Sequence, residues 1–229
     1  MKLIRNFLLV GVLFATGAFA NNLLTNGSFE LGSFVDNGHG GDALSVGSTF
    51  GSPLTTTGWT VTTAALFWLN NSGYYSATPE AGSYFVDLAY ANPFAGVSQV
   101  VNLAAGSYAL TFYLGSYVGT TAPNGAGPVY LTASASENSQ TLATNSSFSS
   151  PSGGSGNVWG QQTLNFSVAT AGNVTINLVG TYAQNHTYLG LDNVDLEYLG
   201  TGVPEPAMFL PLALAGAFFV LSRRKRARQ

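Results

Sequence analysis

Residues 107–114 read SYALTFYL, and this stretch decides the fold class. Its even positions hold large apolar side chains, whereas most of its odd positions hold small or polar ones. An extended chain points successive side chains to opposite sides, so one face of this segment is apolar and the other is polar. The alternation predicts a half-buried strand of an antiparallel sheet.

The same period of two recurs along the chain. Residues 174–178 and 194–198 alternate in this way. Outside the two ends no window shows a helical period with caps, and 28 glycines supply frequent turn signals. These features predict an all-β fold, a β-sandwich of one domain over residues 21–200, with long loops at 115–128 and 144–157. Four further stretches predict strands: SYFVDLAY (83–90), VSQVVNL (97–103), VYLTASA (129–135) and QTLNFSV (162–168).

The charges are unevenly distributed. All seven basic residues lie in the first five or the last seven positions, and the chain has no cysteine. Residues 21–203 carry nine acidic side chains and no Lys or Arg, a formal charge of −9. Such a domain cannot neutralise phosphates, so nucleic acid is excluded as a partner and anionic polymers would be repelled. Neutral sugars and divalent cations remain plausible ligands.

The N-terminus has the pattern of a secretory signal peptide. Lys2 and Arg5 precede an apolar run, and residues 18–20 read AFA, a small-x-small cleavage site. We therefore expect export, cleavage by a signal peptidase and a mature chain that starts near Asn21. The alternative is a short N-terminal helix that packs on the domain.

The C-terminus combines an apolar run with a basic end. Residues 207–221 are a predicted transmembrane helix of fifteen residues, about 22 Å long. A full span needs roughly 20 residues, so this helix is short. The positive-inside rule places the basic cluster on the cytoplasmic side of the inner membrane and the domain outside. An ordinary permanent tail anchor is the alternative. The basic tail comprises Arg223, Arg224, Lys225, Arg226 and Arg228.

The last 27 residues resemble the PEP-CTERM sorting signal of Gram-negative bacteria. The motif is Val203, Pro204, Glu205 and Pro206, followed by the apolar run and the basic tail over residues 201–229. The resemblance implies processing by an exosortase, a membrane transpeptidase-like enzyme. It also implies transient membrane anchoring, followed by display on the cell surface or in an extracellular matrix. Proteins with this tail tend to occur in species that make exopolysaccharide and biofilm.

The domain resembles the DUF642-like and choice-of-anchor C families, whose fold is a galactose-binding-like jelly roll. Matching pieces follow in the family order: NLLTNGSFE (22–30), GWTV (58–61), GSYFVDL (82–88), GVSQVVNLAAGSYALTFYLG (96–115) and LGLDNVDLEYL (189–199). The segment 37–58 does not align. The resemblance implies an exported surface protein, of which several relatives bind polysaccharide or cell wall.

A structural Ca²⁺ is also implied by the resemblance, because such jelly rolls often hold one between the first and last strands. Glu30 and Asp192 occupy the matching positions, and Asp36 and Asp42 could contribute further oxygens. In the alternative interpretation Glu30 caps backbone amides and Asp192 forms a turn.

A sugar-binding platform is predicted in LFWLNNSGYYSATPEAG (66–82). Tyrosine and tryptophan offer an apolar face with a polar group, and asparagine amides can bond sugar hydroxyls. The alternative places Trp68 in the core, and Trp59 and Trp159 are predicted to be structural. The predicted ligand-binding residues are Trp68, Asn70, Asn71, Tyr74 and Tyr75.

No motif of a nucleophilic or zinc enzyme occurs in the chain. Nine carboxylic acids leave a glycosidase pair open, but no pattern marks one. We therefore expect a protein without catalytic activity that binds carbohydrate or the exopolysaccharide matrix. The alternatives are a purely structural biofilm protein, an adhesin for protein partners and a weak glycosidase.

Overall fold

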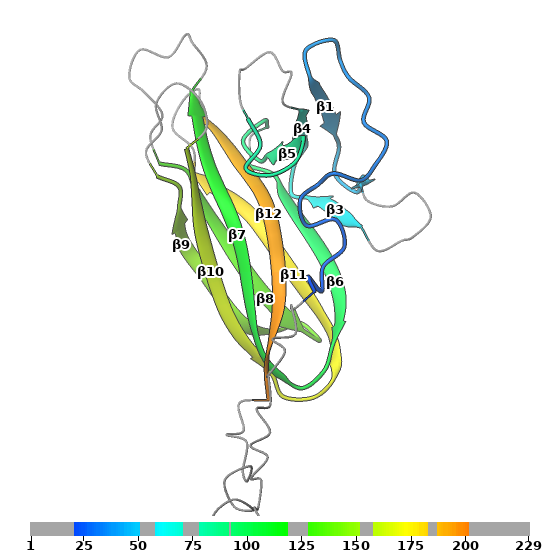
Figure 1. The fold of residues 1–229 in the computed structure, drawn as a ribbon, viewed down its shortest axis with the longest axis vertical. Helices are drawn as coiled ribbons and strands as arrows, with labels where there is room; N and C mark the ends of the chain where they lie inside the picture. Colours follow the sequence, from blue (N-terminus) through cyan, green and yellow to red (C-terminus); the bar gives the residue numbers. More distant parts are fainter. Residues whose placement is uncertain are drawn as a thin grey trace, which may run out of the picture.

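The computed structural model describes residues 21–50, 58–70, 78–91, 93–118, 128–151, 158–182 and 187–201. These residues form an all-β domain of two six-stranded sheets, and every strand pair is antiparallel (Figure 1). The prediction of an all-β jelly-roll sandwich is confirmed. Within the described ranges no helix is long and apolar enough to cross a membrane. The predicted signal helix and the predicted transmembrane helix lie outside these ranges.

Sheet A contains three short strands and three long ones. Its order is β1-β4-β5-β12-β7-β10. In Figure 1 the long strands β12, β7 and β10 lie in front of the other sheet. The strand bounds are Gly41–Leu44 (β1), Leu66–Asn70 (β4), Tyr84–Asp87 (β5), Thr187–Gly200 (β12), Gly106–Val118 (β7) and Val158–Val168 (β10).

Sheet B lies behind sheet A and has the order β2-β3-β6-β11-β8-β9. Its strands β8 and β9 form a hairpin whose register shifts twice. The strand bounds are Thr49–Phe50 (β2), Trp59–Thr62 (β3), Gly96–Leu103 (β6), Gly172–Tyr182 (β11), Tyr130–Glu137 (β8) and Gln140–Ser149 (β9).

The core lies between the two sheets, and the segment SYALTFYL behaves as its alternation predicts. Tyr108, Leu110, Phe112 and Leu114 all point inward from β7 and are at most 2% exposed. They belong to one cluster with the buried side chains of the other long strands, including Ile176 of β11. Burial of this apolar area, at about 25 cal/mol per Å², is the main term that stabilises the fold.

The first residues of the described domain close one side of the core. Two buried indoles hold this segment: Trp59 Nε1 donates to the carbonyl of Asn26 (3.0 Å) and Trp68 Nε1 to that of Phe29 (2.9 Å). The amide of Val194 donates to Gly27 O at 2.8 Å, so the segment also contacts β12. At this point the register of β12 against β7 shifts. The prediction that Trp59 is structural is confirmed.

Both predicted long loops begin later than the sequence indicates. β7 continues to Val118 through residues read as loop, and β9 continues to Ser149. The expected boundaries are wrong because Gly and Ser in these two segments lie within regular strands and form no turn there. In the structure Gly115 makes room for an indole ring, and the buried Ser116 hydroxyl donates to Pro151 O at 2.8 Å.

Candidate functional site

The outward side of β12, β7 and β10 carries mostly polar side chains. The three strands are in register, because Thr111 pairs with both Asp195 and Thr163, and Ala109 pairs with both Glu197 and Asn165. The small Ala109 lies between the two polar residues of its row. We call this surface the polar face, and it comprises Thr111, Tyr113, Gln161, Thr163, Asn165, Asp195 and Glu197.

Two carboxylic acids lie in neighbouring rows of the polar face. Glu197 is exposed, whereas Asp195 is partly buried. Burial, reinforced by the nearby charge of Glu197, raises the pKa of Asp195 above its usual range. Its Oδ1 is inaccessible to solvent and has no hydrogen-bond partner among the described residues. A partly buried carboxyl with an unused oxygen can accept a hydrogen bond from a ligand hydroxyl after rotation about Cβ–Cγ.

Trp159 lies at the upper end of the polar face, over two glycines. Gly115 pairs with both Gly190 and Trp159. A Cβ added at Gly115 would lie 2.7 Å from Cε3 of the indole, and one added at Gly190 would lie 2.8 Å from Cη2. The indole therefore lies against bare backbone of β7 and β12. Its Nε1 donates to Thr78 O at 3.0 Å, and the side chain remains partly exposed.

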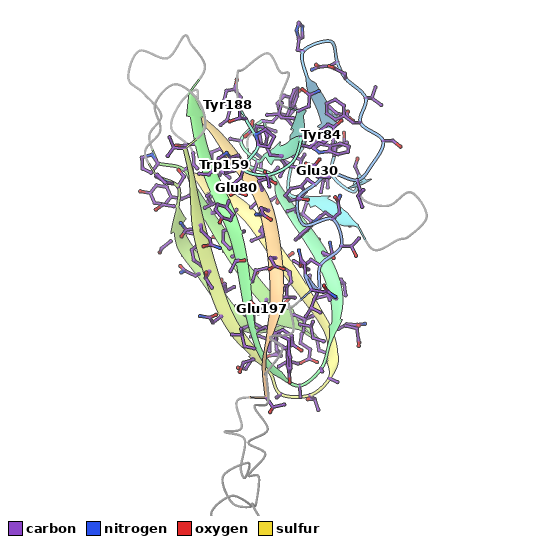
Figure 2. All side chains as sticks on the ribbon, in the orientation of Figure 1. Glu30, Glu80, Tyr84, Trp159, Tyr188 and Glu197 are labelled. Carbon is purple, nitrogen blue, oxygen red and sulfur yellow. The ribbon has the colours of Figure 1, made fainter. Side chains whose placement is uncertain are left out.

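Aromatic side chains continue from Trp159 across the outward side of β5 and β4. The Phe85 ring meets the Trp159 indole edge to face, with centroids 5.6 Å apart. Phe67 packs in the same cluster, and its centroid lies 4.1 Å from that of Tyr90, which is 49% exposed. Figure 2 shows Trp159 and Tyr188 together near the upper end of the domain, with Glu197 lower on β12. The polar face thus has an aromatic border.

The two predicted metal ligands bind backbone amides of one segment. Glu30 Oε1 accepts from Ser83 N (2.9 Å) and Tyr84 N (2.8 Å). Asp192 Oδ2 accepts from Glu80 N (2.8 Å) and Ala81 N (3.1 Å). Together these four hydrogen bonds hold residues 80–84 beside β12.

The environment of Asp192 is dominated by its burial. Burial raises the pKa of Asp192 to about 7, against the amides of Ala81, Asn193 and Glu80, which favour the ionised form. The neighbouring Glu80 carboxylate adds a small increase. The amide of Asn193 donates to Oδ1 at 2.7 Å, and its side-chain nitrogen donates to Glu80 Oε2 at 2.9 Å.

This donor set does not fit a calcium site. Calcium needs six to eight oxygens, but N–H groups already occupy Glu30 Oε1 and both oxygens of Asp192. No group of three or more His, Asp or Glu side chains in the described ranges is placed to hold a metal. Asp36 Oδ1 accepts from the amides of Gly38 and Gly40, and Asp42 Oδ2 from Val35 N. The Gly40 amide is the main cause of a lowered Asp36 pKa.

The predicted stacking platform is wrong at Trp68. This side chain is 1% exposed and lies in the main core, where its ring meets Phe34 and Tyr84. Its neighbours on both sides in β4, Phe67 and Leu69, point outward instead. Asn70 ends β4 and is partly buried. Asn71, Tyr74 and Tyr75 lie outside the described residues.

Trp159 is an aromatic residue of the candidate site that the sequence analysis does not place there. It was predicted to be structural, which its hydrogen bond and glycine contacts support, but it also borders an exposed polar surface. The available signal was a glycine inside each of two strands, at Gly115 and Gly190. Glycine in a strand often marks the close approach of another group.

Three solved structures show what the fold is similar to. The carbohydrate-binding module described as CBM4 is 11% identical, with a TM-score of 0.38, over 76% of this chain and 99% of its own. The CBM22-1 xylan-binding domain of Paenibacillus barcinonensis Xyn10C is 14% identical, with a TM-score of 0.41, over 71% and 97%. The isomalto-dextranase of Arthrobacter globiformis T6, complexed with panose, is 17% identical, with a TM-score of 0.42, over 69% of this chain and 23% of its own.

No protein-family model matches the chain, and no curated protein matches it. These solved structures, all below 25% identity and below a TM-score of 0.5, assign no function to the chain.

Proposed function

We propose that this domain binds a neutral glycan without catalysis, through the polar face and the Trp159 ring. The observation that carries the proposal is the arrangement on β12, β7 and β10. A surface of amides, hydroxyls and carboxylates lies beside an indole that rests on bare backbone. Sugar rings offer hydroxyl groups around their edges and C–H groups on their faces, and this surface complements both.

The charge of the surface favours a neutral polymer over an anionic one. The polar face carries two acids, Asp195 and Glu197, and residues 21–203 hold no Lys or Arg. Carboxylates accept charge-assisted hydrogen bonds from hydroxyl donors. Gln161 and Asn165 are exposed on β10 and can both donate and accept. A phosphate-bearing or sulfate-bearing polymer would be repelled by the two carboxylates and would find no cationic side chain to bind.

Binding of the purified protein to a panel of neutral glycans, measured by calorimetry, tests this proposal. The double variant Gln161→Ala/Asn165→Ala should weaken binding at least about tenfold, because it removes both side-chain amides from the polar face. The matched control is Thr175→Ala/Asn177→Ala, which changes two polar positions of sheet B outside the polar face. Equal affinity in both variants would refute the assignment of the face.

The same panel distinguishes binding from hydrolysis. Asp195 and Glu197 are two residues apart on one strand and on one side of it. A glycosidase needs two carboxyl groups on either side of the scissile bond. We expect no release of reducing sugar. Turnover that disappears in both Asp195→Asn and Glu197→Gln would instead assign hydrolysis to this pair.

We further propose that the chain is exported and sorted to the cell surface by an exosortase. Support comes from the sequence alone: the signal-like N-terminus, Val203 to Pro206, the apolar run and the basic tail. A glycan-binding domain so displayed would contact the exopolysaccharide matrix. Mass spectrometry of the surface-associated protein should find no peptide that contains Arg223 to Arg228. Recovery of that tail on the mature protein would contradict the proposal.

A further inference from the structure

The two sheets end in four edge strands, of which three carry ordinary protection against pairing. β1 and β2 have four and two residues. β9 has ten residues, but its register against β8 shifts between Leu131 and Ala133 and again between Ala135 and Ser136. Short length and bulges are two of the devices by which proteins prevent edge-to-edge association.

β10 has none of these devices. Its eleven residues pair with β7 without a single register shift, from Val158 opposite Ser116 to Val168 opposite Gly106. The strand contains no charged residue and no proline. Gln161, Thr163 and Asn165 are exposed, whereas Leu164 and Phe166 are buried. The strand is therefore regularly paired with β7 along one edge and anchored on its inner side, and its other edge ends sheet A.

The backbone of β10 has unused hydrogen-bonding groups along this edge. In an antiparallel ladder, an edge strand directs about half of its N–H and C=O groups away from its one partner. Apart from the ladder with β7, the described residues provide no backbone hydrogen bond to residues 158–168. Gln162 Nε2 donates to Ser149 O (3.0 Å), and a Cβ added at Gly160 would lie 2.6 Å from Pro151 Cδ. Residues 149–151 therefore contact β10 without a backbone hydrogen bond to it.

We propose that β10 pairs antiparallel with β10 of a second copy of this chain, so that sheet A continues across a two-fold axis. On the order of ten backbone hydrogen bonds can form between two such strands. Figure 1 places β10 at the outer side of the sandwich, beside β9 and remote from β1. A two-fold axis makes the contact self-complementary and closed.

Charge explains why this edge suits a second copy. Two domains with a charge of −9 repel each other, so a stable contact must keep their carboxylates apart. The acids nearest to the edge within sheet A, Asp195 and Glu197, lie on β12, two strands inward from β10. Across the pair, β12 and its copy would be five strand spacings apart, about 24 Å. That exceeds the screening length of about 8 Å at physiological salt, so the repulsion is largely removed.

Single cysteines test this pairing directly, because the chain has none of its own. When a strand pairs with its own copy and both faces stay continuous, one residue near the centre must lie opposite itself. Residues opposite each other have Cβ atoms about 4.5–5.5 Å apart, close enough for a disulfide after slight adjustment. The variants are Gln161→Cys, Gln162→Cys, Thr163→Cys, Leu164→Cys and Asn165→Cys, each in the full chain.

Mild oxidation should give a covalent dimer, and the yield of this dimer should be highest for one of the five cysteine variants. Thr144→Cys on β9 and Ser98→Cys on β6 are the controls and should give only the background level. Thr163→Lys should raise the dimer dissociation constant at least about tenfold in sedimentation experiments, since a lysine near the middle of an edge strand opposes pairing and the two-fold axis brings in a second like charge. Its melting temperature should stay near that of the parent, because Thr163 is exposed. Equal cross-linking at all seven positions, or dimerisation unchanged by Thr163→Lys, would overturn the proposal.

Discussion

Asp87 should make this domain less stable as the pH rises from 4 to 8. The carboxyl group is 1% exposed, and burial raises its pKa to about 7 from a usual value of 3.8. Oδ1 accepts from Ala89 N (2.8 Å) and Leu189 N (2.9 Å), whereas Oδ2 has no partner among the described residues. The folded state therefore holds a proton that the unfolded chain has already released.

The sign and size of the effect follow from linkage. Between about pH 4 and pH 7 the folded state binds more protons than the unfolded state, so the free energy of unfolding falls as the pH rises. One pH unit corresponds to about 1.4 kcal/mol, which gives about 4 kcal/mol over this window for Asp87. Asp192, with its pKa also near 7, acts in the same direction.

Asp87→Asn isolates this contribution. Asparagine keeps an oxygen for the two amides and cannot ionise, so it resembles the protonated acid. We expect the variant to match the parent near pH 4 and to exceed its unfolding free energy by up to about 4 kcal/mol at pH 8. Urea denaturation at pH 4.5, 6 and 8 measures both, with Glu137→Gln as a control that removes one charge elsewhere. A parent protein whose stability is level or rises over this range, or a variant with an unchanged slope, would refute the reasoning.

Three further predictions concern packing and metal. Gly190→Ala should displace the Trp159 indole, because the new Cβ would lie 2.8 Å from Cη2. We expect a loss of about 1–3 kcal/mol in stability and a change in indole fluorescence. Unchanged fluorescence and melting would show that the indole does not rest on Gly190. Trp68→Ala should cost about 3–5 kcal/mol in urea denaturation, whereas Tyr90→Ala, at a 49% exposed position, should cost far less; similar losses would show that Trp68 is not a core residue. The melting temperature should be the same in chelator and in millimolar Ca²⁺, because amides occupy the Glu30 and Asp192 oxygens; a rise with Ca²⁺ would restore the calcium expectation, since a ligand of the folded state must stabilise it.

The sequence predicts the sandwich because strand alternation is a local property. The buried side chains of residues 107–114 could be named in advance, since each strand needs only its own period. The candidate site could not be found in this way. Thr111 meets Asp195 and Thr163 only through the register of three strands far apart in the sequence.

Trp68 and Trp159 show that a polar sequence around a tryptophan does not tell which side of the sheet the side chain faces. Trp68 stands next to a polar loop, which suggested exposure, but its position in the pleat of β4 directs it to the core. Trp159 stands in an equally polar stretch and points to the outward side, where two glycines from other strands leave room for it. Which face of a strand is covered depends on the partner strands, and no single segment contains that information.

The register shift in β12 has a consequence for how this chain tolerates insertions and deletions. Asp192 pairs with Tyr113 and Asp195 with Thr111, so Asn193 and Val194 together lie opposite Phe112 alone. Residues three apart normally point to opposite sides of a sheet, but this extra residue brings both aspartates to the same side while Leu191 and Leu196 both remain inside. Asn193, at φ 47°, is the extra residue at the bulge between the two halves of the strand. If this one residue were lost, Asp192 and Asp195 would be two residues apart, and the ordinary alternation of a strand would keep both on the polar side and Val194 in the core.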